Sequence, residues 1–532
     1  MLSKESRRLI DKPTFFGALV LLLSVTIPLL LFQEEGEKWV QAAHYFVTYN
    51  FGSLYLALGL GAFFFMLYVA FSRIGRIYLG DPDEEPEFGM LSWCAMLFCA
   101  GVGAGIMYWA PVEWVYYYKN PPFFIEPESA EALRWASTYG IFHWGPLAWS
   151  LYLVPALPIA YFFHVRHGRV LKVSEAIAPV IGARAAHSFG GKMIDVLFVF
   201  GMLGGGATAL GFAAPLINQG LHELLGVPIN ISIQIIVLMV CTAIFGASAY
   251  SGLKKGIQNL SRINIYLAFL LMGFVFIAGP TVFLADASLE SIGVLLGKFI
   301  QMSTWIEPFG GFGEYEDTQF PQNWTIFYWA WWLAYAPTIG LFIARISRGR
   351  TMGSMILGAL FFGTLGCALF FMTIGNYGIY LHISDSVDVV GILTNDSHTA
   401  AVFAVLGALP MKSLVIGVFT LLTIIFLATT FDSISYTLAS VVQVDVHDEP
   451  MRWNRLFWAG AMSLMPVSLM FLGGLNTLQT ASIVAGAPLI IVAILLCIST
   501  LKVTRHDLAR HDSQDQDRIL LDDFAKRDPW AK

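Results

Sequence analysis

Three aromatic side chains fall within one apolar stretch, residues 142–152, which reads F-H-W-G-P-L-A-W-S-L-Y. If this stretch is one helix, Trp144, Trp149 and Tyr152 lie within roughly 140° of one face, at about 100° per residue. Rings around a small space attract a cation through their quadrupoles, and quaternary ammonium groups suit such cages. The residues therefore predict one wall of an onium-binding site, with ordinary aromatic packing as the alternative.

A second aromatic group lies in residues 324–337, W-T-I-F-Y-W-A-W-W-L-A-Y-A-P. Trp331 and Trp332 sit near the middle of this hydrophobic stretch, too deep for the aromatic belt of a membrane interface. Pro337 frees a backbone carbonyl in the same region. We expect these tryptophans to close the site from another helix.

Glycines two residues apart mark residues 99–107, C-A-G-V-G-A-G-I-M. Gly101, Gly103 and Gly105 do not form the G-x-x-x-G seam of a helix pair. Such spacing favours unwound backbone, which a membrane tolerates only beside a cavity or inside protein. Close helix packing is the alternative. A dinucleotide-binding loop is excluded because no strand precedes the glycines.

Two neighbouring hydroxyls and one carboxylate occur in residues 428–433, A-T-T-F-D-S. An acid such as Asp432 is costly in lipid and indicates a polar lining. The hydroxyls of Thr429 and Thr430, with freed carbonyls, are oxygen ligands of the kind that Na⁺ takes in transporters. The alternative is that both threonines bond back to their own helix.

The scaffold that must hold these groups is a membrane domain. The chain has 532 residues, 57% of them hydrophobic and 13% charged, about half the usual charged share. A span needs roughly 20 apolar residues. Twelve such stretches are centred near residues 23, 62, 100, 152, 206, 239, 275, 335, 366, 424, 465 and 490. The sequence therefore predicts an all-α polytopic membrane protein with twelve transmembrane helices.

The distribution of positive charge predicts the orientation. Lys and Arg gather in loops on one side, at Arg73, Arg76, Arg166, Arg169, Lys172, Lys254, Lys255, Arg345, Arg348, Arg350, Arg452 and Arg455. The positive-inside rule then places both termini in the cytoplasm. We expect the chain to be a multi-pass protein of the cell (inner) membrane. No cleavable signal precedes the first span.

The chain organises as one membrane domain, residues 13–503, between short cytoplasmic tails, residues 1–12 and 504–532. Residues 289–304 are amphipathic and too short to span, so we expect them to lie along the outer face. The sequence has no phosphate loop, no His/Cys metal cluster and no nucleophile elbow. It therefore predicts neither an enzyme nor a nucleic-acid-binding protein, and no organic cofactor.

The motifs together resemble the betaine/choline/carnitine transporter (BCCT) family over roughly residues 15–503. The resemblance rests on F-Y-W-A-W-W followed by A-R-I-S-R-G-R-T (residues 327–332 and 344–351), on the stretch 142–152, on the glycine segment, and on Glu113-Trp114. It implies a secondary active transporter with two inverted five-helix repeats, spans 3–7 and 8–12. It also implies a homotrimer with a membrane-parallel helix matching residues 289–304.

The resemblance assigns roles to the aromatic residues and glycines. It implies an aromatic box of Trp144, Trp149, Tyr152 and one of Trp331 and Trp332, with Trp331 preferred. Tyr116 matches a substrate-lining tyrosine. We expect Gly103 and Gly105 to border the substrate, with backbone amides that meet its carboxylate.

The implied substrate is a zwitterion, because choline carriers tend to have an acid where this chain has Gly105. Betaine, carnitine, dimethylsulfoniopropionate and trimethylamine N-oxide all remain open. An ion channel would not need the box, and a receptor for methylated ammonium compounds would keep the box without moving solute.

The motifs give conflicting indications about whether transport is coupled to Na⁺. Na⁺-coupled members use two hydroxyls, here Thr429 and Thr430, with carbonyls that match Cys99 and Val102. Carnitine/butyrobetaine antiporters have an arginine in the seventh span instead, where this chain has Asn264. The segment M-Y-W-A-P-V-E-W-V-Y-Y is nevertheless more similar in sequence to the carnitine branch of the family. We expect Na⁺ symport, with Na⁺-independent antiport as the alternative.

Overall fold

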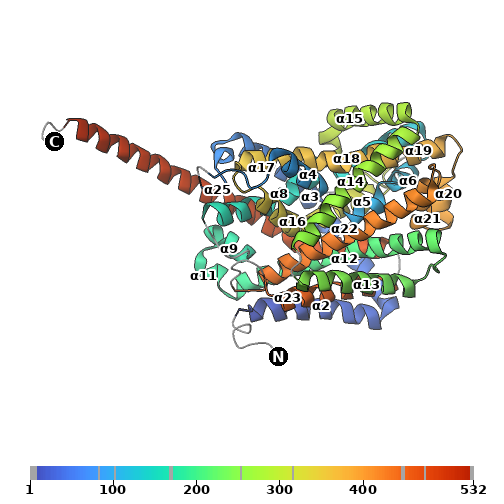
Figure 1. Ribbon diagram of the computed structural model, residues 1–532, viewed down its shortest axis with the longest axis horizontal. Helices are drawn as coiled ribbons and strands as arrows, with labels where there is room; N and C mark the ends of the chain where they lie inside the picture. Colours follow the sequence, from blue (N-terminus) through green and yellow to red (C-terminus); the bar gives the residue numbers. More distant parts are fainter. Residues whose placement is uncertain are drawn as a thin grey trace.

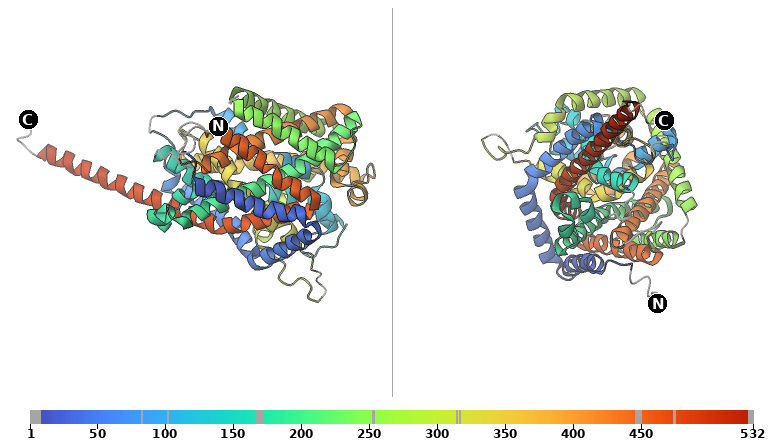
Figure 2. Two further views of the ribbon diagram at one scale, coloured as in Figure 1. Left: turned by 90° about the horizontal axis from the view of Figure 1, so that it is seen from below. Right: turned by 90° about the vertical axis from the view of Figure 1, so that its left-hand side faces the viewer.

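Long helices lie alongside one another in the computed structural model, and α25 extends beyond the bundle toward the C-terminus (Figure 1). Viewed from the end at which α25 leaves the bundle, the helices form one rounded group (Figure 2). The structure describes residues 9–81, 84–100, 103–166, 172–251, 254–313, 315, 317–444, 450–472 and 475–527. In those residues there is no β-strand, only bridges from Ile10 to Gln443 and from Tyr78 to Thr351.

The elements follow in chain order. The α-helices are α2 (Lys12–Leu31), α3 (Gln33–Phe71), α4 (Met90–Ala100), α5 (Ala104–Trp109), α6 (Glu113–Lys119), α7 (Ala130–His143), α8 (Pro146–Ala160), α9 (Val173–Ala176), α10 (Ala178–Ile181), α11 (Ala183–Ala186), α12 (Phe189–Leu225), α13 (Ile231–Ser251), α14 (Lys254–Ala278), α15 (Thr281–Thr304), α16 (Phe327–Ile346), α17 (Met352–Gly358), α18 (Thr364–Phe370), α19 (Asn376–Ile383), α20 (Val389–Asn395), α21 (His398–Gly407), α22 (Lys412–Val441), α23 (Arg452–Met462), α24 (Leu464–Leu472) and α25 (Leu475–Arg527). The short 3₁₀ and π turns are η1 (Arg73–Arg76), η2 (Tyr161–Val165), η3 (Pro321–Ile326), η4 (Ala359–Gly363) and η5 (Phe371–Gly375).

Apolar length identifies a polytopic membrane protein. Within the described residues, eight helical segments are long and apolar enough to cross a membrane, and the bent pair α14–α15 makes nine if it is one span. They cover eight of the twelve predicted centres, and the bent pair covers the one near residue 275. The centres near residues 100 and 465 lie on α4 and α24, which are interrupted and short, and the one near residue 239 lies on α13.

The glycine segment interrupts the third predicted span. Helix α4 ends at Ala100 and α5 begins at Ala104, with Gly103 extended at φ −126° and ψ −174°. The unwound backbone expected here is present at Gly103. Gly101 and Val102 lie outside the described residues, as does the side chain of Cys99.

The prediction that Trp144, Trp149 and Tyr152 share one helix is wrong. Trp144 is the C-terminal cap of α7, with φ −99° and ψ 5°, and α8 begins two residues later at Pro146. Proline at the first position of a helix is tolerated because that position needs no N–H donor. Gly145 makes the close turn possible, since a Cβ there would lie 2.4 Å from the Ile141 carbonyl oxygen.

Two further boundaries differ from expectation. The amphipathic helix α15 begins at Thr281, eight residues before the predicted start at residue 289, and it is bent by 112° from the preceding helix. Pro280 supplies the break between α14 and α15, because it cannot continue the hydrogen-bonding of the preceding helix. Helix α25 continues without interruption past residue 503 to Arg527, so no change of structure marks the expected tail.

Packing of the central helices fixes the site. Helix α16, with Pro337 in its interior, packs along α8, and α12 packs against α22 and α25. The segments that sequence analysis singled out therefore meet in the interior from α5, α7, α8, α16 and α22.

Candidate functional site

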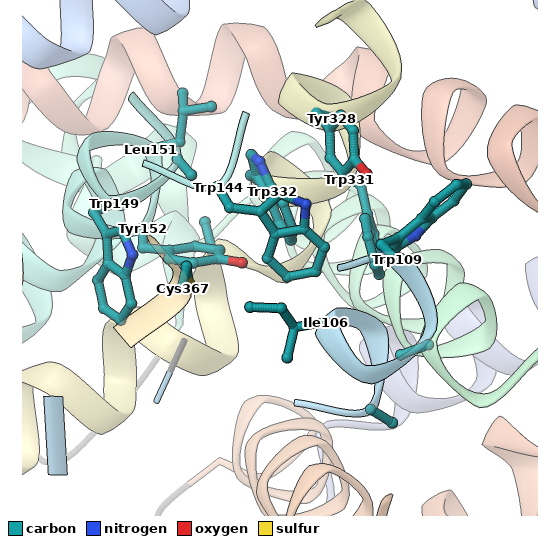
Figure 3. Close-up of a cluster of buried hydrophobic side chains, with 14 of the residues drawn as sticks. Ile106, Trp109, Trp144, Trp149, Leu151, Tyr152, Tyr328, Trp331, Trp332 and Cys367 are labelled. Carbon is teal, nitrogen blue, oxygen red and sulfur yellow. The ribbon is translucent and has the colours of Figure 1, made fainter. Parts of the chain in front are cut away.

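Trp332 lies at the centre of a buried aromatic cluster (Figure 3). Its ring centroid is 4.7 Å from Trp144, 5.8 Å from Tyr152 and 4.7 Å from Trp331. Trp331 is stacked on it at 18°, whereas Trp144 and Tyr152 meet it nearly edge to face, at 68° and 73°. Trp149 joins the cluster through Tyr152, 5.6 Å away at 89°. The five predicted rings thus lie in one continuous cluster, despite the break before α8.

Three indole N–H groups of this cluster donate to protein acceptors. Trp144 Nε1 donates to Glu113 Oε2 at 3.3 Å, Trp331 Nε1 to the Gly205 carbonyl at 3.3 Å, and Trp332 Nε1 to a backbone carbonyl at 2.8 Å. Because these N–H donors already have protein acceptors, a cation would interact with the π faces of the rings. That is the chemistry of a site for a methylated onium group, which has no N–H of its own.

Gly105 lies directly against two of these tryptophans. A Cβ at Gly105 would be 2.8 Å from Trp331 Cη2 and 3.3 Å from Trp144 Cη2. The short helix α5 therefore approaches the cluster as closely as only glycine permits. Trp149 is fixed similarly on its far side, since a Cβ at Gly363 would be 2.1 Å from its indole.

Tyr116 occupies a second ring layer. Its hydroxyl donates to His398 Nδ1 at 2.9 Å, because His398 Nε2, 2.7 Å from the Tyr108 carbonyl, carries the proton of the neutral ring. Tyr116 packs on Trp109 at 6.0 Å, and Trp109 packs on Tyr328 at 6.3 Å. Within the described residues, Tyr116 is thus connected to the cluster through intervening rings.

One of the predicted cation ligands, Thr430, lies beside the interrupted span. Thr429 Oγ1 donates to the Phe426 carbonyl at 3.0 Å, the back-bonding that was the alternative for this residue. The Thr430 hydroxyl interacts with the hydroxyl of Tyr335, and a Cβ at Gly103 would lie 4.0 Å from Thr430 Oγ1. The last carbonyls of an α-helix lack partners within the helix, so the end of α4 leaves carbonyl oxygens available at the break that Thr430 borders.

Asp432 is paired with a positive charge. Arg455 Nη2 lies 2.6 Å from Asp432 Oδ1, and their side chains are 6% and 22% exposed. The guanidinium groups of Arg455 and Arg345 lie 5.4 Å and 4.9 Å from the centre of the Tyr436 ring. This ion pair ties α22 to α23, so the carboxylate does not by itself mark an ion path.

Sequence analysis gave no role to Glu113 or to Tyr328, an aromatic partner of the box. Glu113 is fully buried and accepts hydrogen bonds from Trp144 and Tyr328. Tyr328 stacks on Trp332 at 5.5 Å and 24°. A signal for Glu113 was present, since a lone acid within the apolar run W-A-P-V-E-W is costly unless it is used.

We expect Trp144→Ala, Trp149→Ala and Tyr152→Ala each to weaken substrate binding by about 0.5–2 kcal/mol per lost ring, or about 2- to 30-fold in Kd. Binding of labelled glycine betaine and carnitine to purified protein measures the effect. Trp39→Ala is the matched control, because Trp39 is 49% exposed on α3. Unchanged affinity in all three folded variants would make the cluster ordinary packing.

A family profile accounts for nearly the whole chain. The profile of BCCT, the betaine/carnitine/choline family transporters, matches residues 13–509. The matched region includes each segment of the candidate site.

Individual relatives are similar in sequence to this chain along most of their length. The chain is 35% identical to the glycine betaine transporter OpuD of Bacillus subtilis (strain 168), over 90% of this chain and 92% of the relative. It is 35% identical to the transporter YeaV of Escherichia coli (strain K12), over 85% and 92%. It is 30% identical to a carnitine transporter of Acinetobacter baumannii, over 91% and 86%.

Proposed function

The chain belongs to the betaine/carnitine/choline transporter family, whose members are membrane transporters and not enzymes, and from this premise we propose that it is a Na⁺-coupled symporter. Its cargo is a small zwitterion with a methylated ammonium or sulfonium group. Betaine and carnitine are the first candidates, since two relatives are named for them. Dimethylsulfoniopropionate and trimethylamine N-oxide have the same onium character.

The aromatic cluster around Trp332 carries this proposal. Trp144, Tyr152 and Trp331 surround Trp332, and the tryptophan N–H groups of this set donate to protein atoms. The ring faces supply the attraction for the onium group. Trp332 contacts both Trp144 and Tyr152, which favours it over Trp331 as the shared wall, although both tryptophans belong to the proposed site.

The carboxylate of the zwitterion would lie toward the glycine segment. Gly105 contacts the cluster and Gly103 begins the turn before α5, so backbone amides are the available donors there. Tyr116, in the neighbouring ring layer, would border the same substrate. An acid at position 105 would repel the substrate carboxylate, but this chain has glycine at that position.

Na⁺ coupling is supported by the neighbourhood of Thr430. Its oxygen lies beside Gly103 at the break between α4 and α5, and Thr429 can accept a cation on its lone pairs while donating to Phe426. Cys99 and Val102 are the proposed carbonyl ligands. The position that holds an arginine in carnitine/butyrobetaine antiporters is Asn264, which is buried and neutral.

The remaining architecture is part of the same proposal. Twelve spans, ten of them in two inverted repeats, would enclose the site, with α15 on the outer face and both termini in the cytoplasm of a homotrimer. The membrane domain would cover residues 13–503, with short tails on either side.

Uptake into proteoliposomes tests the proposal. We expect labelled glycine betaine or carnitine to accumulate above its external concentration under an inward Na⁺ gradient, and more strongly at negative inside potential. A zwitterion gains nothing from the potential, whereas one Na⁺ gains about 2.3 kcal/mol per 100 mV. Accumulation against a gradient excludes a channel and a receptor. Exchange that is equally fast without Na⁺ would instead establish the antiporter.

A further inference from the structure

Glu113 is a buried carboxylate whose partners belong to the aromatic cluster. It opens α6 and is 0% exposed. Tyr117 donates to its Oε1, while Tyr328, at 2.7 Å, and Trp144, at 3.3 Å, donate to its Oε2. Among the described residues no lysine or arginine pairs with it, so three neutral donors hold this acid.

The hydrogen-bond network fits an ionised Glu113. An indole N–H can only donate, so Oε2 must accept from Trp144. Tyr117 also contacts His143 Nδ1 at 2.9 Å, and His143 Nε2 contacts Thr325 Oγ1 at 3.1 Å. With Glu113 ionised, Thr325 donates to the neutral imidazole, the imidazole donates to Tyr117, and Tyr117 donates to Glu113. Each of these four side chains then has a hydrogen-bond partner, as a charged group in a protein interior requires.

One of the three donors, Trp144, is a ring of the proposed binding site, and a second, Tyr328, packs against that site. Trp144 packs on Trp332 at 4.7 Å, and Tyr328 stacks on Trp332 at 5.5 Å. Figure 3 shows these three rings grouped together. A hydrogen bond to an anion fixes the indole plane and increases its electron density, which strengthens the attraction of its face for a cation.

We propose that Glu113 is a positioning residue that holds the Trp144 ring and makes the box favour a cationic headgroup over a neutral group of the same shape. The inference rests on the proposed onium-binding function. It adds a carboxylate that shapes selectivity through a tryptophan and need not touch the substrate.

A double-mutant cycle tests the action through Trp144. Glu113→Gln keeps the shape and an acceptor but removes the charge, and Trp144→Phe keeps a ring but removes the donor. Kd values for labelled glycine betaine are measured for wild type, both single variants and the double variant. We expect Glu113→Gln to weaken binding about fivefold, and to have little effect once Trp144 is phenylalanine. Independent, additive effects would overturn the proposal, as would unchanged binding in Glu113→Gln.

Selectivity gives a second readout that a purely structural role would not change. The compound 3,3-dimethylbutanoate has the shape and carboxylate of glycine betaine but a neutral tert-butyl group. We expect Glu113→Gln to lower the preference for glycine betaine over this competitor, and an unchanged preference would contradict the proposal. The matched control is Glu131→Gln, because Glu131 also accepts from an indole, Trp135 Nε1 at 2.9 Å, but its own side chain is 49% exposed. If wild type binds neither glycine betaine nor carnitine, the proposed function fails. If it binds and the cycle is additive, only the role of Glu113 fails.

Discussion

Gly105→Leu is expected to abolish transport in a protein that still inserts and folds. Even a Cβ would lie 2.8 Å from Trp331 and 3.3 Å from Trp144, so a leucine side chain must displace both rings or fill the space between them. Displacing both rings removes two contacts with the substrate worth about 0.5–2 kcal/mol each, which together correspond to about a 5- to 800-fold loss of substrate affinity. Initial uptake rates and equilibrium binding of labelled glycine betaine and carnitine measure the loss.

Gly61→Leu is the matched control for this variant. Gly61 lies on α3, and a Cβ there meets nothing within 4 Å. Both variants should elute as folded protein, and only the change at Gly105 should lose transport. Normal uptake by Gly105→Leu would show that α5 does not border the substrate path.

Thr430→Ala is expected to raise the Na⁺ concentration for half-maximal uptake by about 10- to 150-fold, the effect of losing one bond to a charged group worth about 1.5–3 kcal/mol. A Cβ at Gly103 would lie 4.0 Å from the Thr430 hydroxyl oxygen. Substrate affinity at saturating Na⁺ should change much less. Uptake as a function of Na⁺ concentration separates the two quantities.

Thr423→Ala serves as the control on the same helix, because the Thr423 hydroxyl donates to the Phe419 carbonyl at 2.9 Å in the packed interior of α22. An equal shift in both variants would show that threonine removal perturbs the helix in general. If Thr430→Ala does not change the Na⁺ concentration for half-maximal uptake, the hydroxyl of Thr430 does not bind Na⁺, and the antiporter is favoured.

Hydrophobic length and aromatic content predicted the membrane class well, because both are local properties of the sequence. The break between Trp144 and Pro146 was signalled by Gly145-Pro146, since glycine permits the turn and proline suits a helix start. Treating residues 142–152 as one helix ignored that signal. The predicted rings still lie together, because α16 brings Trp332 against Trp144 before the break and against Tyr152 after it.

Contacts between distant segments could not be predicted in this way. Whether Trp331 or Trp332 faces Tyr152 depends on how α16 is rotated against α8, and adjacent residues point about 100° apart. The bond from Trp144 to Glu113 likewise depends on how α6 packs against the end of α7. Tertiary packing alone sets both.

Equilibrium binding to purified protein in nanodiscs tests the central claim most directly. Labelled glycine betaine and labelled carnitine are measured against wild type, Trp332→Ala and the exposed-site control Trp39→Ala. We predict saturable binding of at least one compound to wild type and the control, and a loss of about 2- to 30-fold or more in Trp332→Ala. Binding of neither compound to wild type, or equal affinity in wild type and Trp332→Ala, would contradict an onium site built around Trp332.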